Sequence, residues 1–165
     1  MEFVNFMREE AFRQKVERLF EEQKNRIQSL LPQADIQHIG STAIPNSLTK
    51  GDLDIQVRIP TELFTVAVNK LSKIYDTNDG SHRSATFAAF KDDALDPPLG
   101  VQLTVIGGEE DFFSKLRDFF KVHDNYRLEY DNLKKQFEGK SMEEYREAKS
   151  KFIENLMETD EFQAL

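Results

Sequence analysis

Cysteine is absent from the 165-residue sequence, which excludes disulfide bonds, thiolate metal sites and a cysteine nucleophile. Tryptophan is absent too, and no stretch approaches the roughly 20 apolar residues that a membrane span needs. The N-terminus, Met1-Glu2-Phe3-Val4-Asn5-Phe6, has neither a basic flank nor an uninterrupted apolar run, so we expect no secretory signal. These absences together predict a cytoplasmic protein without a membrane partner.

Positive charge is in short supply. Lys and Arg number 22 against 30 Asp and Glu, a net charge of −8 that opposes non-specific binding to nucleic acid or anionic lipid. A small anionic ligand can still bind through a few local cations. With 39% hydrophobic residues and 14 Phe, the composition is that of a globular protein with a phenylalanine-rich core.

Hydrophobic periodicity and turn residues divide the chain into short elements. We expect a first helix over residues 8–31 that ends before Pro32, and a second over residues 61–74. Four strands are expected over residues 35–39, 53–59, 85–90 and 101–106.

After Gly107 and Gly108 the pattern becomes helical, and Ser141 with Glu144 forms a capping-box signal for the last helix. We expect the apolar stripe of this region to be core, namely Phe112, Phe113, Leu116, Phe119 and Phe120. The order predicts an α+β fold with a terminal helical layer. We expect one domain, 1–165, made of a sheet core with the N-terminal helix (1–108) and a C-terminal helical layer (109–165).

The stretch with most chemistry is His38-Ile39-Gly40-Ser41-Thr42, followed by Asp52-Leu53-Asp54. Two carboxylates at i and i+2 of a strand share one face, and a Gly-Ser turn shortly before them can hold phosphate beside carboxylate-bound Mg²⁺. Taken singly, the alternating strand and the Gly-Ser turn are also ordinary structural features. Their order and spacing favour a nucleotidyl-transfer site.

The run His38-Ile39-Gly40-Ser41-Thr42-Ala43-Ile44-Pro45, with Leu48, Lys50 and Asp54-Ile55 after it, resembles the signature of the GrpB family. This family is a branch of the nucleotidyltransferase superfamily, also catalogued as an uncharacterised UPF0157-type family. The resemblance continues through Arg117-Asp118-Phe119-Phe120 with His123, Tyr130-x-x-Leu-Lys134 and Tyr145-x-x-x-Lys149, so it covers nearly the whole chain.

The resemblance implies a polymerase-β-like, nucleotidyltransferase-like fold, with a mixed β-sheet flanked by helices and the C-terminal helices packed against it. In this fold a Gly-Ser turn follows the first strand and an Asp-x-Asp pair lies on the next. Gly40 and Ser41 would then bind phosphate, and Asp52 and Asp54 would be the catalytic metal ligands. Many members have an apolar residue where Asp52 stands, so this chain carries the fuller acidic pair.

One departure from active members of the superfamily concerns their third carboxylate, on a later strand. This chain offers Gln102 or Thr104 there, and neither can act as a general base. Asp92 or Asp93, at the end of the preceding strand, is the alternative source of an acid.

Further candidates for the phosphate site are Thr42, His38, Lys50, Arg83, Lys134 and Lys149. A histidine at a strand end often satisfies only local polar groups, and lysine or arginine in a loop is often solvated surface. The pairs Tyr130–Lys134 and Tyr145–Lys149 place an aromatic ring and a cation on one helical face, which suits either a nucleotide or helix packing with the lysine stems buried.

The leading hypothesis is a Mg²⁺-dependent nucleotidyltransferase that moves a nucleoside monophosphate from a nucleoside triphosphate, ATP being favoured, to a small-molecule acceptor. The alternative is a catalytically inactive nucleotide-binding or interaction module that keeps the fold, as the missing third carboxylate suggests. A third reading treats residues 109–165, with 15 acidic and 10 basic residues, as a docking surface for a basic partner. The acceptor and the oligomeric state are left open.

Overall fold

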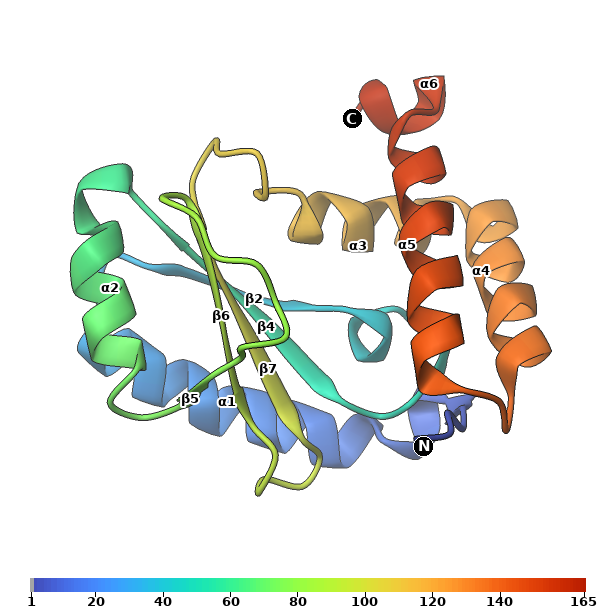
Figure 1. The fold of residues 1–165 in the computed structure, drawn as a ribbon, viewed down its shortest axis with the longest axis horizontal. Helices are drawn as coiled ribbons and strands as arrows, with labels where there is room; N and C mark the ends of the chain where they lie inside the picture. The colour runs from blue at the N-terminus through green and yellow to red at the C-terminus, as the bar shows by residue number, and fades with distance from the viewer. Residues whose placement is uncertain (1) are drawn as a thin grey trace.

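A five-stranded mixed sheet in the order β2-β4-β7-β6-β5 forms the centre of the protein, seen in a computed structural model that describes residues 2–165 (Figure 1). Met1, where the expected N-terminal segment begins, lies outside the described residues. The strands are β2 (Asp35–Ile39), β4 (Leu53–Ile59), β5 (Asp76–Thr77), β6 (Phe87–Asp92) and β7 (Leu99–Val105). Strand β4 runs parallel to β7, and the other neighbours pair antiparallel.

One face of the sheet carries most of the hydrophobic core. Ile55 and Val57 of β4 and Leu103 of β7 are fully buried on this face. Helix α1 (Arg13–Leu30) and helix α2 (Phe64–Leu71), which follows the 3-10 turn η3 (Thr61–Leu63), cover it (Figure 1). Burying these apolar side chains stabilises the pairing of α1 and α2 with the sheet.

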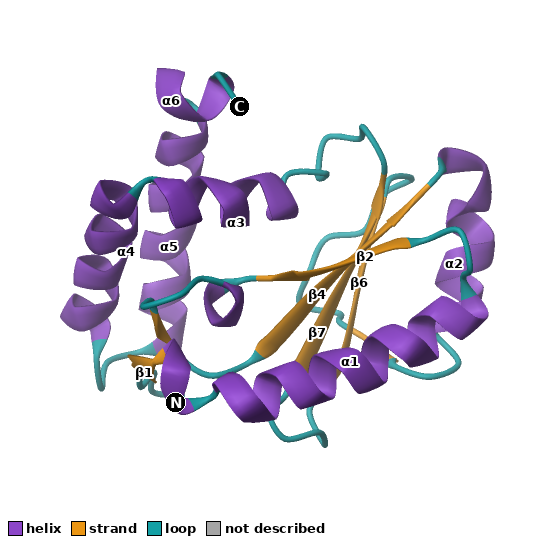
Figure 2. Ribbon diagram, turned by 180° about the vertical axis from the view of Figure 1, so that it is seen from behind, coloured by secondary structure: helices purple, strands orange, loops and turns teal. Residues whose placement is uncertain are grey.

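The remaining helices gather beyond the other side of β2, as Figure 2 shows from behind. They are α3 (Phe113–Val122), α4 (Asp124–Phe137), α5 (Met142–Met157) and α6 (Asp160–Gln163). Their apolar side chains form a second cluster around Phe119 and Phe120, and Ile44 of the loop after β2 is buried in it. This loop therefore lies between the sheet and the helical layer.

Short elements fasten the N-terminal segment to that loop. Strand β1 (Met7–Arg8) pairs antiparallel with β3 (Leu48–Thr49), and the 3-10 turn η1 (Glu9–Ala11) follows β1. The 3-10 turn η2 (Ser41–Ala43) comes directly after Gly40. The pairing of β1 with β3 thus attaches the N-terminal segment to the loop that carries the Gly-Ser motif.

The predicted α+β arrangement is confirmed, including the Gly-Ser turn after the first sheet strand and the Asp pair at the start of the next. Strands 35–39 and 53–59 have the predicted bounds, whereas the expected strands 85–90 and 101–106 are shifted to Phe87–Asp92 and Leu99–Val105. The helix expected over 61–74 is shorter, because its first turn is 3-10 and α2 ends at Leu71. Over residues 2–165 every helix is too short or too polar to cross a bilayer.

Candidate functional site

Strand β4 presents a polar row to the α3 side of the sheet and an apolar row to the α1 side. Successive side chains of a strand point to opposite faces, so Asp54, Gln56 and Arg58 share one face. Gln56 Oε1 accepts a hydrogen bond of 3.2 Å from the backbone N–H of Ser114 in α3, which identifies that face. Asp54 is the first residue of this row.

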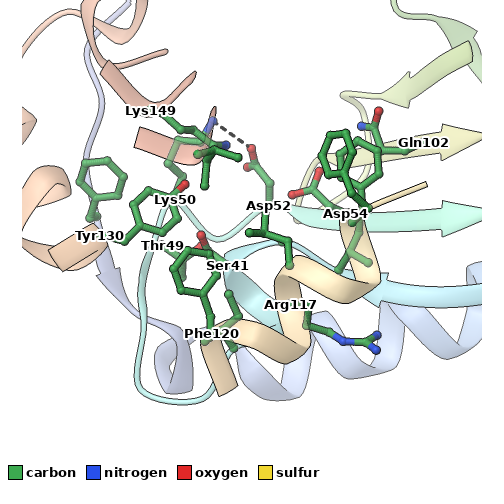
Figure 3. Close-up of a pocket in the computed structure, with 18 of the residues that line it drawn as sticks. Ser41, Thr49, Lys50, Asp52, Asp54, Gln102, Arg117, Phe120, Tyr130 and Lys149 are labelled. Carbon is green, nitrogen blue, oxygen red and sulfur yellow. Dashed lines mark ion pairs between the residues drawn. The ribbon is translucent and has the colours of Figure 1, made fainter. Parts of the chain in front are cut away.

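A pocket of about 280 Å³ opens in front of Asp54, between the sheet, the loop after β2 and the C-terminal helices (Figure 3). Asp52 and Asp54 both line it, as their i, i+2 spacing predicts. Gly40 and Ser41 line it from the loop and Lys149 from α5. A volume near the lower end of the range for ligand sites suits a small ligand or part of a larger one.

The Asp54 carboxylate sits between two glycines. A Cβ atom at Gly40 would lie 2.6 Å from Asp54 Oδ2, and a Cβ at Gly100 would lie 2.8 Å from Oδ1. Gly40 also has φ +78°, a conformation that residues with side chains rarely adopt. Both glycines therefore leave the space that the carboxylate occupies.

Burial raises the pKa of Asp54 to about 6. Lys149 opposes this shift, Asp52 adds to it, and Lys50 opposes it more weakly. The negative charge of Asp54 is thus costly in the protein alone, and a cation bound at the carboxylate would offset that cost.

Asp52 has a partner. Its carboxylate forms an ion pair with Lys50 at 3.5 Å, drawn as a dashed line in Figure 3, and the two side chains are 37% and 30% exposed. A pair so exposed to solvent contributes little stability. Asp52 is therefore not locked away from a ligand entering the pocket.

Comparisons with known proteins agree on one family. The profile described as "GrpB protein" matches residues 10–159. The UPF0157 protein VC_A0354 of Vibrio cholerae serotype O1 is 30% identical over 154 residues, which are 93% of this chain and 82% of that protein. The chain belongs to the GrpB family. The family membership predicted from the motif is therefore confirmed.

A solved structure from the same family has a similar fold. The crystal structure of the conserved protein GrpB from Enterococcus faecalis matches with a TM-score of 0.64 at 18% identity, over 79% of this chain and 81% of that chain. The Cid1 poly(U) polymerase with MgGTP bound matches with a TM-score of 0.48 at 12% identity, over 68% of this chain and 38% of that chain.

Whether this GrpB-family protein suits Mg²⁺ depends on its oxygen donors. Within residues 2–165, groups of three or more His, Cys, Asp or Glu placed to hold a metal do not occur. Mg²⁺ often takes only one or two carboxylates and fills its octahedral shell with water and substrate phosphate. The half-buried Asp54 carboxylate with its raised pKa, beside Asp52, fits such an ion.

Gln102 lies on β7, the strand on which active members of the superfamily are expected to carry a third carboxylate. It lines the pocket, while Thr104 is fully buried and accepts a hydrogen bond of 3.0 Å from Gln56 Nε2. Asp92 and Asp93 do not line the pocket. Asp92 follows Lys91 in β6, so its side chain points to the opposite face of the sheet from that of Lys91, and Asp93 forms an ion pair with Lys91 at 3.1 Å. Recruitment of Asp92 or Asp93 as the third acid is therefore wrong for this structure.

Lys134 has a different place from the expected one. It is 1% exposed, and its ammonium donates to the Ser41 hydroxyl at 3.0 Å and to the Leu48 carbonyl. Burial lowers its pKa to about 7. Lys134 lies under the Gly-Ser turn and does not line the pocket. The expectation that it contacts a triphosphate directly is therefore corrected: in this structure Lys134 supports the turn.

The same helix holds the loop at two further points. The Leu48 N–H donates to Asp131 Oδ1 at 3.0 Å, and Arg127 donates to the Asn46 carbonyl at 3.2 Å and to Asp131 Oδ2 at 3.2 Å. Arg127, Asp131 and Lys134 share one face of α4. We call these three residues the α4 clamp.

His38 and Thr42 also hold the loop after β2 in place. His38 stacks on Phe20 of α1, on the face of the sheet away from the pocket, and its Nε2 lies 3.0 Å from the Thr42 hydroxyl. Thr42 donates to the Asp52 carbonyl at 2.9 Å. Burial, with Arg117 and Lys121, lowers the pKa of His38 to about 4. Both residues connect the turn to β4, and neither lines the pocket.

Arg83 is exposed in the loop before β6 and does not belong to the pocket lining, so its expected role in phosphate binding is corrected. Lys50 and Lys149 do line the pocket. Sequence reasoning missed Gly100, whose place inside a strand pattern was the available signal, since glycine there often marks a close approach. It also placed Phe112, Phe113 and Leu116 in the core, whereas these partly exposed side chains line the pocket.

Proposed function

We propose that this GrpB-family protein is a divalent-cation-dependent nucleotidyltransferase, which transfers a nucleoside monophosphate from a nucleoside triphosphate, with ATP favoured, to a small-molecule acceptor. The observation that carries the proposal is the Asp54 carboxylate between Gly40 and Gly100, next to Asp52 and at the edge of the Gly-Ser turn. Transfer of this kind depends chiefly on positioning and charge neutralisation. A carboxylate confined between two glycines, beside the Gly-Ser turn, is suited to both.

In this proposal the chain contributes three kinds of group. Gly40 and Ser41 receive the β- and γ-phosphates at the backbone of the turn, and Lys50 and Lys149 offset phosphate charge from two sides of the pocket. Asp52 and Asp54 hold Mg²⁺, which when bound neutralises charge on the phosphates and orients them. The α4 clamp keeps the turn in place while the ligand binds.

The proposed reaction needs no reactant beyond the nucleoside triphosphate and the acceptor. A hydroxyl oxygen of the acceptor forms a bond to the α-phosphorus, the bond from that phosphorus to the β-bridging oxygen breaks, and pyrophosphate leaves. The hydroxyl proton passes to solvent, since Gln102 cannot accept it. The products are the nucleotidylated acceptor, pyrophosphate and a proton.

The test is the variant Asp54→Asn, which keeps the shape of the side chain and removes its charge. Calorimetric titration with ATP should show Mg²⁺-dependent binding to the wild type and none to the variant, while circular dichroism shows both folded. Asp79→Asn, an exposed residue in the loop after β5, is the matched control and should bind like the wild type. Equal affinity of Asp54→Asn and wild type for ATP with Mg²⁺ would refute the proposal.

A second candidate function is nucleotide binding without turnover. It is favoured by Gln102, which places a neutral amide in the pocket on the strand where a third acid is expected in an active enzyme. Both candidates predict the loss of ATP binding in Asp54→Asn, so turnover separates them. Release of labelled pyrophosphate from γ-labelled ATP with any acceptor excludes the non-catalytic candidate.

A further inference from the structure

The pocket has two sides of different chemistry. Figure 3 shows Asp52 and Asp54 between Ser41 and Lys50 on one side and Gln102 on the other. The side that holds Gln102 also includes the apolar side chains at the start of α3, which are Phe112, Phe113 and Leu116. We call these four residues the α3 shelf.

The start of α3 is fixed over the sheet next to Gln102. The backbone N–H of Ser114 donates to Gln56 Oε1 at 3.2 Å, and Gln56 is the register partner of Gln102 across the parallel pair β4–β7. The ring of Phe113 stacks toward Phe87 of β6 with centroids 6.3 Å apart. The aromatic side chains of the α3 shelf therefore lie against the β7–β6 part of the sheet.

The guanidinium of Arg117 on this side of the pocket is already hydrogen-bonded within the protein. Arg117 lines the pocket, but its guanidinium donates to Gln37 Oε1 and to the His38 carbonyl at 2.9 Å each, and to Asp118 at 2.9 Å. The amide of Gln102 forms no side-chain hydrogen bond with any residue from 2 to 165, although it borders the pocket. A neutral amide and aromatic rings are thus what this side offers a ligand.

The direction of the proposed reaction gives this side a role. Attacking and leaving oxygens lie roughly in line at the reacting phosphorus. With the β- and γ-phosphates at Gly40 and Ser41, the leaving group departs on the turn side of the two aspartates. The acceptor then approaches from the side of Gln102.

We propose that the α3 shelf is the acceptor subsite, and that the acceptor is a small uncharged alcohol or phenol with an aromatic body. The aromatic body packs on Phe112, Phe113 and Leu116, and the neutral hydroxyl exchanges a hydrogen bond with the amide of Gln102. The preference for a neutral aromatic ligand follows from the side chains of the α3 shelf alone, whereas the role of that ligand as acceptor rests on the proposed nucleotidyltransferase function.

Charged acceptors and nucleic acid fit this side poorly. The carboxylates of the pocket, Asp52 and Asp54, are assigned to Mg²⁺ in this proposal, and its lysines, Lys50 and Lys149, are assigned to the phosphates. The remaining cation, Arg117, is already engaged by Gln37 and the His38 carbonyl. Desolvating a charge without a partner is costly. The pocket volume of about 280 Å³ also limits the acceptor to a small molecule.

Three probes with one phenol body and different charge test the inference. They are 2-(4-hydroxyphenyl)ethanol, which is neutral, tyramine, which is cationic, and 4-hydroxyphenylacetate, which is anionic. Ligand-observed NMR titration of the full chain at pH 7.5 gives the affinity of each, with and without Mg²⁺ and α,β-methylene-ATP. We expect the neutral probe to bind about tenfold or more tightly than either charged probe, a difference of about 1.4 kcal/mol.

Two shelf variants sharpen the result. Phe113→Ala should weaken the neutral probe about tenfold through lost apolar contact. Gln102→Glu should reverse the preference toward tyramine, because the new carboxylate gives the ammonium a partner. Val122→Ala, at an α3 residue that is 70% exposed and away from the pocket, is the control and should leave all three affinities unchanged.

The outcomes separate the two proposals. Preference for the neutral probe that Phe113→Ala and Gln102→Glu alter as described supports the α3 shelf as a site for neutral aromatic ligands. If ATP fails to bind in the same experiments, the shelf keeps this role and only its assignment to an acceptor falls with the proposed function. Equal affinity for the three probes, tightest binding of a charged probe, or affinities that neither shelf variant changes would overturn the subsite. Intact ATP binding in that case leaves the proposed function standing.

Discussion

Gly100 of β7 is the register partner of Asp54 of β4, and its missing side chain leaves the space for one oxygen of the Asp54 carboxylate. The two strands run parallel, and a Cβ atom at Gly100 would lie 2.8 Å from Asp54 Oδ1. Real Cβ atoms essentially never approach an oxygen so closely. The orientation of the proposed metal ligand thus depends on a residue 46 positions away in the sequence.

Gly100→Ala should therefore move the Asp54 carboxylate out of its place. Unlike Gly40, Gly100 does not have a positive φ, so alanine meets no backbone strain and the effect is steric. We expect Mg²⁺-dependent ATP affinity to fall about tenfold or more, with about 1–2 kcal/mol lost from the free energy of unfolding. Calorimetric titration and urea denaturation measure the two effects.

Gly80→Ala is the matched control, because a Cβ there would meet only the Asn78 side chain at 3.4 Å. It should leave ATP affinity and stability near those of the wild type. An unaltered ATP affinity in Gly100→Ala would show that the position of the Asp54 carboxylate does not matter for the ligand.

The elements next to the motif were predictable from local signals. Gly40 and Pro60 mark the ends of β2 and β4, and the alternation between them reports a strand with one polar face. The joint exposure of Asp52 and Asp54 to the pocket follows from their spacing alone. These features depend on neighbouring residues, which a sequence displays directly.

Features that depend on long-range packing were not predictable. The Tyr130–Lys134 pattern suits a lysine reaching a ligand as well as a lysine buried under a loop, and the structure has the second. The periodicity of Phe112, Phe113 and Phe119 likewise reports an apolar face without telling whether a helix or a pocket lies against it. Only the packing of α3 on the sheet separates Phe119, which is buried, from Phe112 and Phe113.

The raised pKa of Asp54 predicts a specific dependence of stability on pH. Its folded pKa of about 6 exceeds the ordinary value of 3.8, so between these values the folded protein binds more protons than the unfolded chain. This group therefore lowers the free energy of unfolding as pH rises from 4 to 6. Asp54→Asn should remove that loss and be about 3 kcal/mol more stable than wild type at pH 7.5 without divalent cations.

Urea denaturation of wild type and Asp54→Asn at pH 4 and pH 7.5 checks this prediction. The contributions of the other carboxylates to the pH dependence cancel when the free energies of unfolding of the two proteins are subtracted at each pH. Saturating Mg²⁺ with ATP should narrow the gap, since ligand binding stabilises only the wild type. A variant less stable than wild type at pH 7.5 without ligand would contradict the burial of a costly charge at Asp54.

Asp111 supports the start of α3 through a strong ion pair. Arg58 donates to its two carboxylate oxygens at 2.8 and 2.7 Å, and Gln56 donates to it at 2.9 Å. The hydrogen bond from Arg58 holds the pKa of Asp111 below its usual range, so this stabilisation is present at pH 7 and is lost as pH falls through the folded pKa. Asp111→Ala should cost about 2–3 kcal/mol at pH 7 in urea denaturation.

Asp93→Ala is the control for that measurement, because the Asp93 carboxylate is 68% exposed in its pair with Lys91. An exposed pair contributes about 0–1 kcal/mol, so this variant should unfold nearly like the wild type. A loss for Asp111→Ala no greater than that for Asp93→Ala would mean that the ion pair does not hold α3.

The α4 clamp predicts that a residue outside the pocket controls ligand affinity. Lys134→Met keeps a long apolar stem and removes the ammonium that bonds to the Ser41 hydroxyl and the Leu48 carbonyl. Without these bonds the Gly-Ser turn loses support, and ATP affinity should fall about tenfold while the protein stays folded. Lys135→Met, at the neighbouring exposed lysine, is the matched control and should bind ATP as the wild type does.

The same variant has a second readout that direct phosphate binding by Lys134 would not produce. Burial lowers the folded pKa of Lys134 to about 7 from 10.5, so above pH 7 the unfolded chain binds more protons and the free energy of unfolding rises with pH. Wild type should gain about 1–2 kcal/mol relative to Lys134→Met between pH 7 and pH 9, measured by urea denaturation without ligand. Two results together would show that Lys134 does not support the turn. The first is a wild type whose free energy of unfolding does not rise between pH 7 and pH 9 relative to Lys134→Met, and the second is unchanged ATP affinity in Lys134→Met.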